Sequence, residues 1–317
     1  MAIYRLLFST DLHGSSLVYR KFLKSLLTYK AHIGIIGGDL TGKMLIPIIE
    51  MEDHSYQAIV LGNLRRARNK EELQGIINDV ESLGFYYEIM TKSEYEELSS
   101  NNELLNQLFR DKITERIRKW VAITEDFVKT HKIPIYLMPG NDDIIEVDEI
   151  LAQSEYVENP NEKVIQITDE HEMVASAYSN LTPWKCPRDL EEEKLEEILE
   201  RVMNGVKNTK NLIFVSHVPP YNTNIDLAPA LTQDLKYVTK GGTIVMTHVG
   251  SVAVRKIIEK YQPLMGLHGH IHESRGFDRI GRTMVFNPGS EYGEGILHGA
   301  LVAIERDKVK GHILITG

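Results

Sequence analysis

The chain has 317 residues, of which 42% are hydrophobic and 26% charged, and these are ordinary values for a globular protein. That length allows one large domain with elaborations or two modest domains, with a sizeable core in either case. A net charge of −9 argues against a protein that binds nucleic acid through a broad basic surface, because phosphate contacts need clustered Lys and Arg. The net charge does not exclude a local basic groove.

The single cysteine and the N-terminal residues point to a cellular setting. Cys186 has no partner for an intrachain disulfide, which fits a reducing compartment. The apolar start of the chain is short and interrupted by Arg5, so it predicts a first core strand and not a signal peptide. No apolar run approaches the ~20 residues that cross a bilayer. We therefore expect a cytoplasmic protein with no membrane partner.

The first forty residues predict a strand, a helix and a second strand. The ranges are 3–9, 17–29 (capped by Ser15 or Ser16) and 32–37. A β-α-β order is typical of a mostly parallel sheet, whose ligands collect at the carboxyl ends of the strands. Asp11 and His13 follow the first strand and Asp39 follows the second, so all three are expected at that edge.

Residues 43–132 break this pattern. We expect strands at 44–49, 56–61 and 85–90, a helix at 69–83, a Glu-rich segment capped by Thr91 or Ser93, and one or two amphipathic helices over 103–129. Some ninety residues are too many for a structureless loop, so the range predicts an inserted subdomain. Its last helix is expected to pack back on the sheet. The segment near Trp120 is interpreted as core or as a dimer contact, so homo-oligomerisation through the insertion is one expectation.

The remaining chain alternates again between strands and helices. The predicted strands are 133–138, an antiparallel pair 164–168 and 173–178, then 211–215, 264–267, and antiparallel strands at 283–286, 299–306 and 309–316. The predicted helices are 189–206 and 252–261, the second capped by Ser251. Residues 180–187 and 221–240 are interpreted as loops, with a break at Gly241-Gly242 and a strand or loop at 244–248.

Gly269-His270-Ile271-His272 follows the 264–267 strand and places two imidazoles in a loop. Neutral imidazole is a preferred ligand of divalent transition metals. Alone, such a pair also arises by chance or from a strand alternating its faces. Four further strand ends carry metal-capable side chains: Asp11/His13, Asp39, Asn141 and His217. In three of the five segments a glycine precedes the ligand, as a tight strand-to-loop turn requires.

These blocks read D-x-H, G-G-D, G-N-D, S-H and G-H-x-H in order, and in this the chain resembles the calcineurin-like metallophosphoesterases. The resemblance covers nearly the whole length apart from the insertion, and Asn287-Pro288-Gly289-Ser290 is similar to the family's usual tail. It implies an α/β fold, a four-layer sandwich of two mixed sheets flanked by helices. We expect one such domain over 1–317, interrupted by a helical and mixed insertion at about 43–132.

The resemblance also implies a ligand set. Asp11, His13 and His272 would hold one metal, Asn141, His217 and His270 a second, and Asp39 would bridge them and position the attacking water. Carboxylate, amide and imidazole ligands without thiolate suit Mn²⁺, Fe or Zn²⁺. Two cations ~3.5–4 Å apart activate a water and clamp both oxygens of an in-line displacement. The expected reaction is hydrolysis of a phosphomonoester or phosphodiester in a small substrate.

Asp142 departs from the family pattern, because many members have a histidine there that assists the leaving group. A carboxylate can act as the catalytic acid only with a raised pKa or through water. It can instead orient a metal ligand. Both interpretations stay open.

Two other functions remain: a non-catalytic binding or scaffold protein on the same fold, and a nuclease. Retention of all seven ligands favours the enzyme, and the acidic balance counts against long nucleic acid as a partner. We expect the insertion and loops 179–188 and 218–243 to shape the substrate site. Several residues have either a functional or a packing interpretation: His248, Ser251, His268, Arg275, Tyr292, Pro183 and Trp184.

Overall fold

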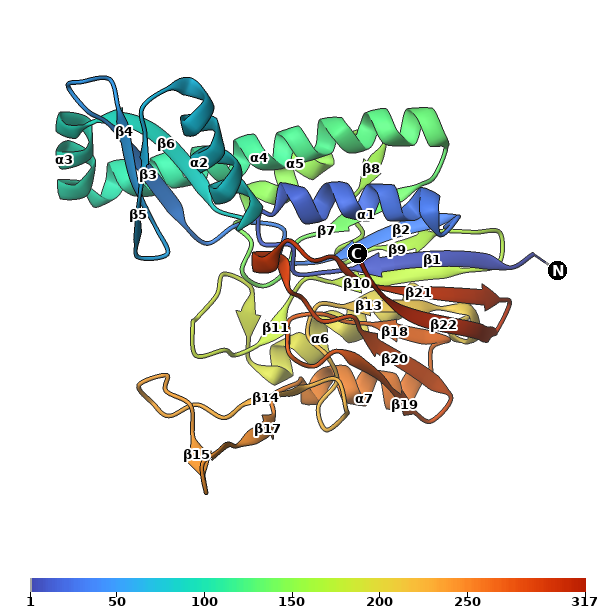
Figure 1. Ribbon diagram of the computed structural model, residues 1–317. Helices are drawn as coiled ribbons and strands as arrows, with labels where there is room; N and C mark the ends of the chain where they lie inside the picture. The colour runs from blue at the N-terminus through green and yellow to red at the C-terminus, as the bar shows by residue number, and fades with distance from the viewer. Residues whose placement is uncertain (1) are drawn as a thin grey trace.

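Two six-stranded mixed sheets pack face to face, with helices on both outer faces, in the computed structural model of residues 2–317 (Figure 1). The predicted four-layer α/β sandwich is confirmed. Met1, part of the predicted domain span, lies outside the described residues.

The first sheet has the strand order β22-β21-β1-β2-β7-β8. Its strands are β1 (Tyr4–Ser9), β2 (Ile33–Gly37), β7 (Ile135–Met138), β8 (Val157–Glu158), β21 (His298–Glu305) and β22 (Lys308–Thr316). Strands β1, β2, β7 and β8 run parallel, and β21 and β22 are antiparallel. The loops after β1, β2 and β7 therefore meet at one edge.

The second sheet has the order β19-β20-β18-β13-β10-β9. Its strands are β9 (Val164–Gln166), β10 (Glu172–Ser176), β13 (Ile213–Ser216), β18 (Met265–Leu267), β19 (Gly276–Ile280) and β20 (Thr283–Asn287). The predicted antiparallel pair is β9–β10. β20 pairs antiparallel with β19, a partly exposed edge strand that was not predicted, and its other neighbour, β18, runs parallel to it.

Apolar side chains of both sheets fill the space between them, among them Phe8 and Ile35 from the first sheet and Val215 and Met265 from the second. Three helices cover the first sheet: α1 (Ser16–Thr28), α4 (Asn102–His131) and α5 (Glu146–Ala152). Two cover the second: α6 (Glu192–Met203) and α7 (Val252–Tyr261). Ser15 and Ser251 cap α1 and α7, as predicted. The short α5 was not predicted.

The insertion has a sheet of its own, in the order β5-β4-β3-β6. Its elements are β3 (Leu45–Glu50), β4 (Tyr56–Val60), β5 (Asn63–Ala67), α2 (Lys70–Ser82), β6 (Tyr86–Thr91) and α3 (Lys92–Ser100). One side of α2 packs on this sheet, with Leu73, Ile76 and Val80 buried in a separate small core. The sequence missed β5, because Asn-Leu-Arg-Arg-Ala at a sheet edge leaves four of its five side chains exposed.

Helix α4 connects the insertion to the main sandwich. It is one helix of 30 residues, which settles the expectation of one or two helices. Ile117, Trp120 and Val121 in its second half are buried in the core that α1 also lines. The Trp120 ring stacks on Tyr19 of α1, with ring centroids 4.2 Å apart. The last helix of the insertion is thus also a helix of the sandwich.

Residues 227–248 form an extended antiparallel arm. Its strands are β14 (Leu227–Pro229), β15 (Thr239–Lys240), β16 (Thr243–Ile244) and β17 (Met246–His248). The strand alternative for 244–248 is confirmed by β17, whereas the break expected at Gly241-Gly242 is the turn of a hairpin, in which both glycines have positive φ. The arm and the insertion overhang the same side of the sandwich (Figure 1).

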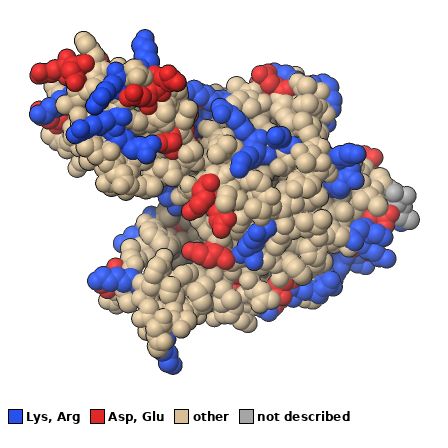
Figure 2. Space-filling model, in the orientation of Figure 1, with Lys and Arg blue, Asp and Glu red and all other residues tan. Residues whose placement is uncertain are grey.

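Smaller elements complete the chain: β11 (Ser179–Asn180), β12 (Asp189–Leu190), η1 (Thr209–Asn211) and η2 (Tyr292–Glu294). Figure 2 shows a hollow between the insertion above and the arm below, with acidic side chains at its edge. Within residues 2–317, the helices are all too short or too polar to cross a membrane.

Candidate metal centre

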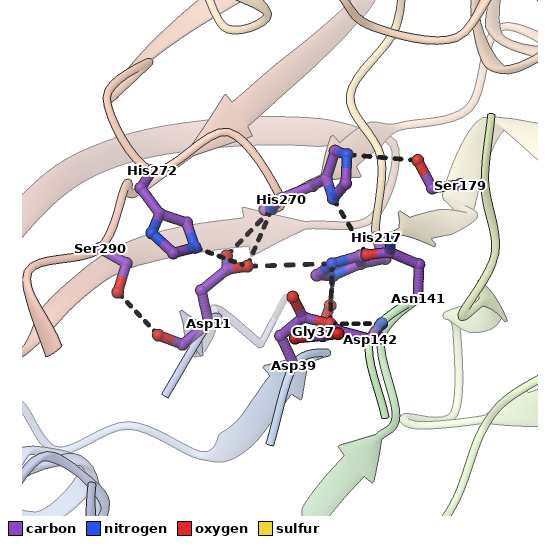
Figure 3. Close-up of polar contacts among 12 residues, drawn as sticks. Asp11, Gly37, Asp39, Asn141, Asp142, Ser179, His217, His270, His272 and Ser290 are labelled. Carbon is purple, nitrogen blue, oxygen red and sulfur yellow. Dashed lines mark hydrogen bonds and ion pairs between the residues drawn. The ribbon is translucent and has the colours of Figure 1, made fainter. Parts of the chain in front are cut away.

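Six of the seven predicted ligand residues are labelled in Figure 3, where they converge at the carboxyl ends of the central strands, and His13 lies beside Asp11 and His272. Asp11 and His13 follow β1, Asp39 follows β2 and Asn141 follows β7. From the second sheet, His217 follows β13, and His270 and His272 follow β18. Asp11, His13, Asp39, Asn141 and His217 are buried, and the last two histidines are partly exposed. The site therefore lies across the junction of the two sheets.

One group consists of Asp11, His13 and His272. The Nε2 atoms of the two histidines are 3.1 Å apart, and His272 Nε2 lies 3.4 Å from Asp11 Oδ1. The Tyr292 ring flanks both imidazoles, with its centroid 4.6 Å from that of His13. Two imidazole nitrogens and a carboxylate oxygen thus face one small volume.

A second group consists of Asn141, His217 and His270. His270 Nδ1 lies 3.0 Å from Asn141 Oδ1, and the His217 and His270 ring centroids are 5.2 Å apart. Asp39 lies between the groups: its Oδ2 is 3.6 Å from His13 Nε2, and its Oδ1 is 3.3 Å from His217 Nε2. Each carboxylate oxygen of Asp39 therefore faces a different group.

The hydrogen bonds behind these side chains leave ligand atoms free at the centre. His217 Nδ1 lies 2.9 Å from the Gly37 carbonyl, so this nitrogen donates and Nε2 faces the centre. Asn141 Nδ2 donates to Asp189 Oδ1 at 2.8 Å, which turns the amide oxygen inward. Such partners commonly fix metal-binding side chains.

A buried polar atom without a hydrogen-bond partner at the centre indicates whether a cation would fit there. His217 Nε2 is buried without a hydrogen-bond partner, and it lies 3.3 Å from Asp39 Oδ1. A buried polar atom without a partner costs about 1–3 kcal/mol. A divalent transition metal would satisfy this nitrogen and the facing carboxylates and imidazoles. The donor set fits the group that the sequence resemblance implies.

The charges favour a cation as well. Burial alone would raise the pKa of Asp11, but His272 outweighs it and holds that pKa well below its usual range. Burial would likewise raise the pKa of Asp39, but His217 outweighs it, so the pKa of Asp39 is also well below its usual value. Burial lowers the pKa of His13 to about 3 and that of His270 to about 4. For His217, Asp39 outweighs burial and raises the pKa to about 9. Without metal, His217 therefore carries a proton that a cation would replace.

The backbone around the ligands is conformationally demanding. Asp11, His13, Asp39 and His270 all have positive φ, between 40° and 68°. Non-glycine residues rarely adopt this region, and such residues cluster at functional sites. A Cβ atom on Gly140 would overlap Asp39, and one on Gly269 would overlap Thr10 and Asp11. The glycines before the ligands are therefore required for close approach.

The sequence analysis missed Asp143, which holds two ligand loops together. Its carboxylate is fully buried and accepts hydrogen bonds from the amides of Leu40, Thr41 and Gly140 and from the Thr41 hydroxyl. Burial, and then the charge of Asp39, raise its pKa to about 6. The only indication of Asp143 in the sequence was that a second aspartate directly follows Asp142. Ser179, 3.3 Å from His270 Nε2, carried no signal at all.

Asp142 lies at the rim of the centre, where it contacts Asp39 and Lys43. Its amide donates to Asp39 Oδ1 at 3.2 Å, and its Oδ2 forms an ion pair with Lys43 Nζ at 2.9 Å. Burial, and then Asp142, raise the pKa of the nearby Cys186 thiol to about 12.

The structure resolves most of the ambiguous residues. Buried His268 contacts the carbonyls of Ser216 and Val218 through Nδ1, behind the centre. His248 Nδ1 lies 2.7 Å from buried Asp226. The carboxylate of Glu192 occupies the start of α7 by accepting from the amides of Val252 and Ala253, so this helix end is not free for phosphate. Arg275 donates to carbonyls of β22, and Trp184 is 63% exposed.

Comparison with known proteins supports the fold. No family model matches the chain. The uncharacterized protein MJ1162 of Methanocaldococcus jannaschii is 39% identical over 157 residues, which is 49% of this chain and 63% of that protein. The match therefore covers less than two thirds of the relative's length.

Solved structures match over nearly the full chain. The crystal structure of TT1561 from Thermus thermophilus has a TM-score of 0.54 at 15% identity, covering 100% of this chain and 99% of that one. Another crystal structure has a TM-score of 0.57 at 16% identity, covering 99% of both chains. The chain has the two-sheet sandwich fold that the resemblance to calcineurin-like metallophosphoesterases implied.

A dimetal phosphatase from Danio rerio matches at a lower level. Its TM-score is 0.41 at 7% identity, covering 99% of this chain and 98% of that one. A likeness at this level says nothing about the activity of the present chain. The function of this two-sheet sandwich has to be argued from its own residues.

Proposed function

We propose that the chain is a phosphoesterase that depends on two divalent cations and hydrolyses a phosphomonoester or phosphodiester in a small substrate. One observation supports this proposal above the others: seven side chains from five strand ends converge, six of them in two groups of three, and the seventh, Asp39, lies between the groups. Asp11, His13 and His272 would hold one cation, and Asn141, His217 and His270 the other, with Asp39 shared. Mn²⁺, Fe and Zn²⁺ suit this donor set.

When bound, the cations would supply Lewis acidity and a positive charge that favours attack of water on an anionic phosphate ester. The residues of the chain hold this arrangement rigid. Asp189 orients the amide of Asn141, the Gly37 carbonyl orients His217, and Asp143 fastens the loop after β2 to the loop after β7. Fixed charges of this kind act without reorganisation during the reaction.

The surroundings favour a small substrate. The hollow between the insertion and the arm is open to solvent, and acidic side chains lie at its edge (Figure 2). Acidic groups repel the backbone of a long nucleic acid, so the nuclease is the weaker alternative. A scaffold protein would not need seven inward-facing ligands, so we favour the enzyme.

Hydrolysis of p-nitrophenyl phosphate and of bis-p-nitrophenyl phosphate, each with added Mn²⁺, tests the proposal. We expect metal-dependent turnover of at least one of them and a loss of at least about a hundredfold in Asp39→Asn, because this variant removes the shared charge. Glu196→Gln, on helix α6 at an ion pair with Lys256, is the control and should retain activity. An inactive wild type on both compounds, together with unchanged metal binding in Asp39→Asn, contradicts the proposal.

A further inference from the structure

Lys43 is a cation at the rim of the metal centre to which the family pattern assigns no role. Its Nζ lies 2.9 Å from Asp142 Oδ2. Oxygen or nitrogen atoms of Asp142, Asp39 and His13 lie within 4.8 Å of one another. The ammonium group is therefore one ion pair away from the group formed by Asp11, His13 and His272.

The backbone that carries Lys43 is fixed on both sides. The carboxylate of Asp143 holds the amides of Leu40 and Thr41 just before it. The Gly42 amide donates to the buried Tyr86 hydroxyl at 2.9 Å, and Arg116 lies over the Tyr86 ring at 5.1 Å. Gly42 also packs so closely on the Gly84 carbonyl that a Cβ atom would overlap it. The backbone at Lys43 is therefore held in place, and the lysine side chain extends from this fixed position.

Lys43 is charged and accessible at the same time. Its side chain is 51% exposed, whereas that of Asp142 is 26% exposed. Burial would lower the pKa of Lys43, but Asp142 and Asp39 outweigh it and raise that pKa, so the ammonium stays protonated. A half-exposed ammonium can keep its carboxylate partner and still offer a donor to an arriving anion.

We propose that Lys43 binds a phosphoryl oxygen of the substrate and that Asp142 is the residue that positions it. This inference rests on the proposed function and supplies what the family histidine would otherwise bring to this rim, a cationic donor. It gives Asp142 a role that needs no proton on the carboxylate. The insertion, which begins at Lys43, thereby contributes directly to substrate binding.

The test compares metal-loaded variants Lys43→Met, Lys43→Arg and Asp142→Asn with the wild type. Lys256→Met is the matched control. Lys256 lies on α7, its side chain is 57% exposed, and its Nζ forms an ion pair at 2.7 Å with Glu196 of α6. Inorganic phosphate is the probe, with its binding measured by calorimetry in the presence of Mn²⁺. KM and kcat for the better nitrophenyl ester, and metal content, are measured in parallel.

A hydrogen bond from a charged donor contributes about 1.5–3 kcal/mol. We therefore expect Lys43→Met to weaken phosphate binding by about tenfold or more and to raise KM similarly, with metal content unchanged. Lys43→Arg should recover most of the affinity, because it keeps the charge and the donors. Asp142→Asn should show a smaller loss, and Lys256→Met none.

The outcomes separate the two proposals. If the wild type hydrolyses the ester but Lys43→Met binds phosphate as tightly as the wild type does, the role of Lys43 is wrong and the phosphoesterase stands. If the wild type neither hydrolyses an ester nor binds phosphate, both are wrong. If Lys43→Met loses metal along with phosphate, the lysine maintains the site and does not bind substrate.

Discussion

At the scale of single residues, the two histidines of the Gly269–His272 segment have different neighbours. His270 Nδ1 faces Asn141, whereas His272 Nε2 faces His13 and Asp11. His270 and His272 are two residues apart in the sequence, and each therefore belongs to a different group of side chains. The proposal that each imidazole serves a different cation follows from these contacts.

This division predicts the metal content of three variants. His270→Ala and His272→Ala should each lose one of the two cations, because each change removes a ligand from only one group. The double variant should lose both. Metal analysis after gel filtration measures this, with His312→Ala on the exposed strand β22 as the control. A double variant that still holds one cation would show that both histidines serve the same site.

A site residue could be predicted where it belongs to a pattern in the sequence, and not where its role depends on a contact that only folding creates. Asp11, His13, Asp39, Asn141, His217, His270 and His272 follow strands in an ordered pattern, so the sequence contains both their identity and their place. Lys43, Asp143 and Asp189 act through distant partners, and a single aspartate or lysine has no pattern of its own. The carboxylate of Asp143 reaches Leu40 across 103 positions of the chain, a contact that only folding creates.

At the scale of elements, α4 has two different halves. Leu104 and Leu105 near its start are 43% and 38% exposed, whereas Trp120 in its second half is 1% exposed. The Trp120 indole also donates to Ser16 Oγ at 3.1 Å. The second half therefore holds α1 and α4 together, and the first half belongs to the insertion.

We expect Trp120→Ala to lower the free energy of unfolding by about 3–5 kcal/mol, because it empties a buried site and removes the stacking on Tyr19. Leu105→Ala on the same helix should cost less than about 1 kcal/mol, since its side chain is partly solvated already. Urea unfolding followed by circular dichroism measures both. Equal effects in the two variants would contradict the division of α4.

Elements with clear periodicity were predictable, and edge elements were not. The 252–261 helix has an apolar face and a serine cap, and its bounds are as predicted. Strands β5 and β19 lie at sheet edges, where exposed Arg side chains obscure the alternation that identifies a strand. The arm was missed for the same reason, because it packs on little and its residues stay mostly exposed. Oligomerisation through the insertion stays a prediction.

At the scale of the whole molecule, the proposed cations would join the two sheets. Asp11, Asp39 and Asn141 extend from the first sheet, and His217, His270 and His272 from the second. A ligand that binds only the folded state stabilises it, by about 2.7 kcal/mol at a hundredfold excess over its dissociation constant. Removal of metal should therefore loosen the entire sandwich and not one loop.

This linkage predicts a pH-dependent difference between metal-free and metal-loaded protein. The pKa of His217 is raised from 6.5 to about 9, so its contribution to the metal-free fold is complete below 6.5 and is lost as pH rises through 9. The contributions of Asp11 and Asp39, whose pKa values are lowered, are lost only in acid.

Between pH 6.5 and pH 9 we therefore expect the free energy of unfolding to fall in chelator-treated protein. It should fall less with metal bound, because a ligating His217 is already neutral. Urea unfolding at both pH values, with EDTA or with Zn²⁺, measures the difference. His217→Gln in EDTA should lack the decline, and a wild type whose two curves run parallel would contradict the prediction.

The pairing of β1 with β21 has a consequence for how the protein folds. The strand that carries Asp11 needs partners on both sides, and the Ser9 hydroxyl bonds the His298 carbonyl 289 positions further along the chain. Until β21 has been synthesised, Leu6 and Phe8 belong to an open sheet edge with unpaired amides. Closing so large a loop is slow, and the exposed strand invites aggregation meanwhile. In a nascent chain, β1 therefore remains a sheet edge until β21 has left the ribosome and can pair with it.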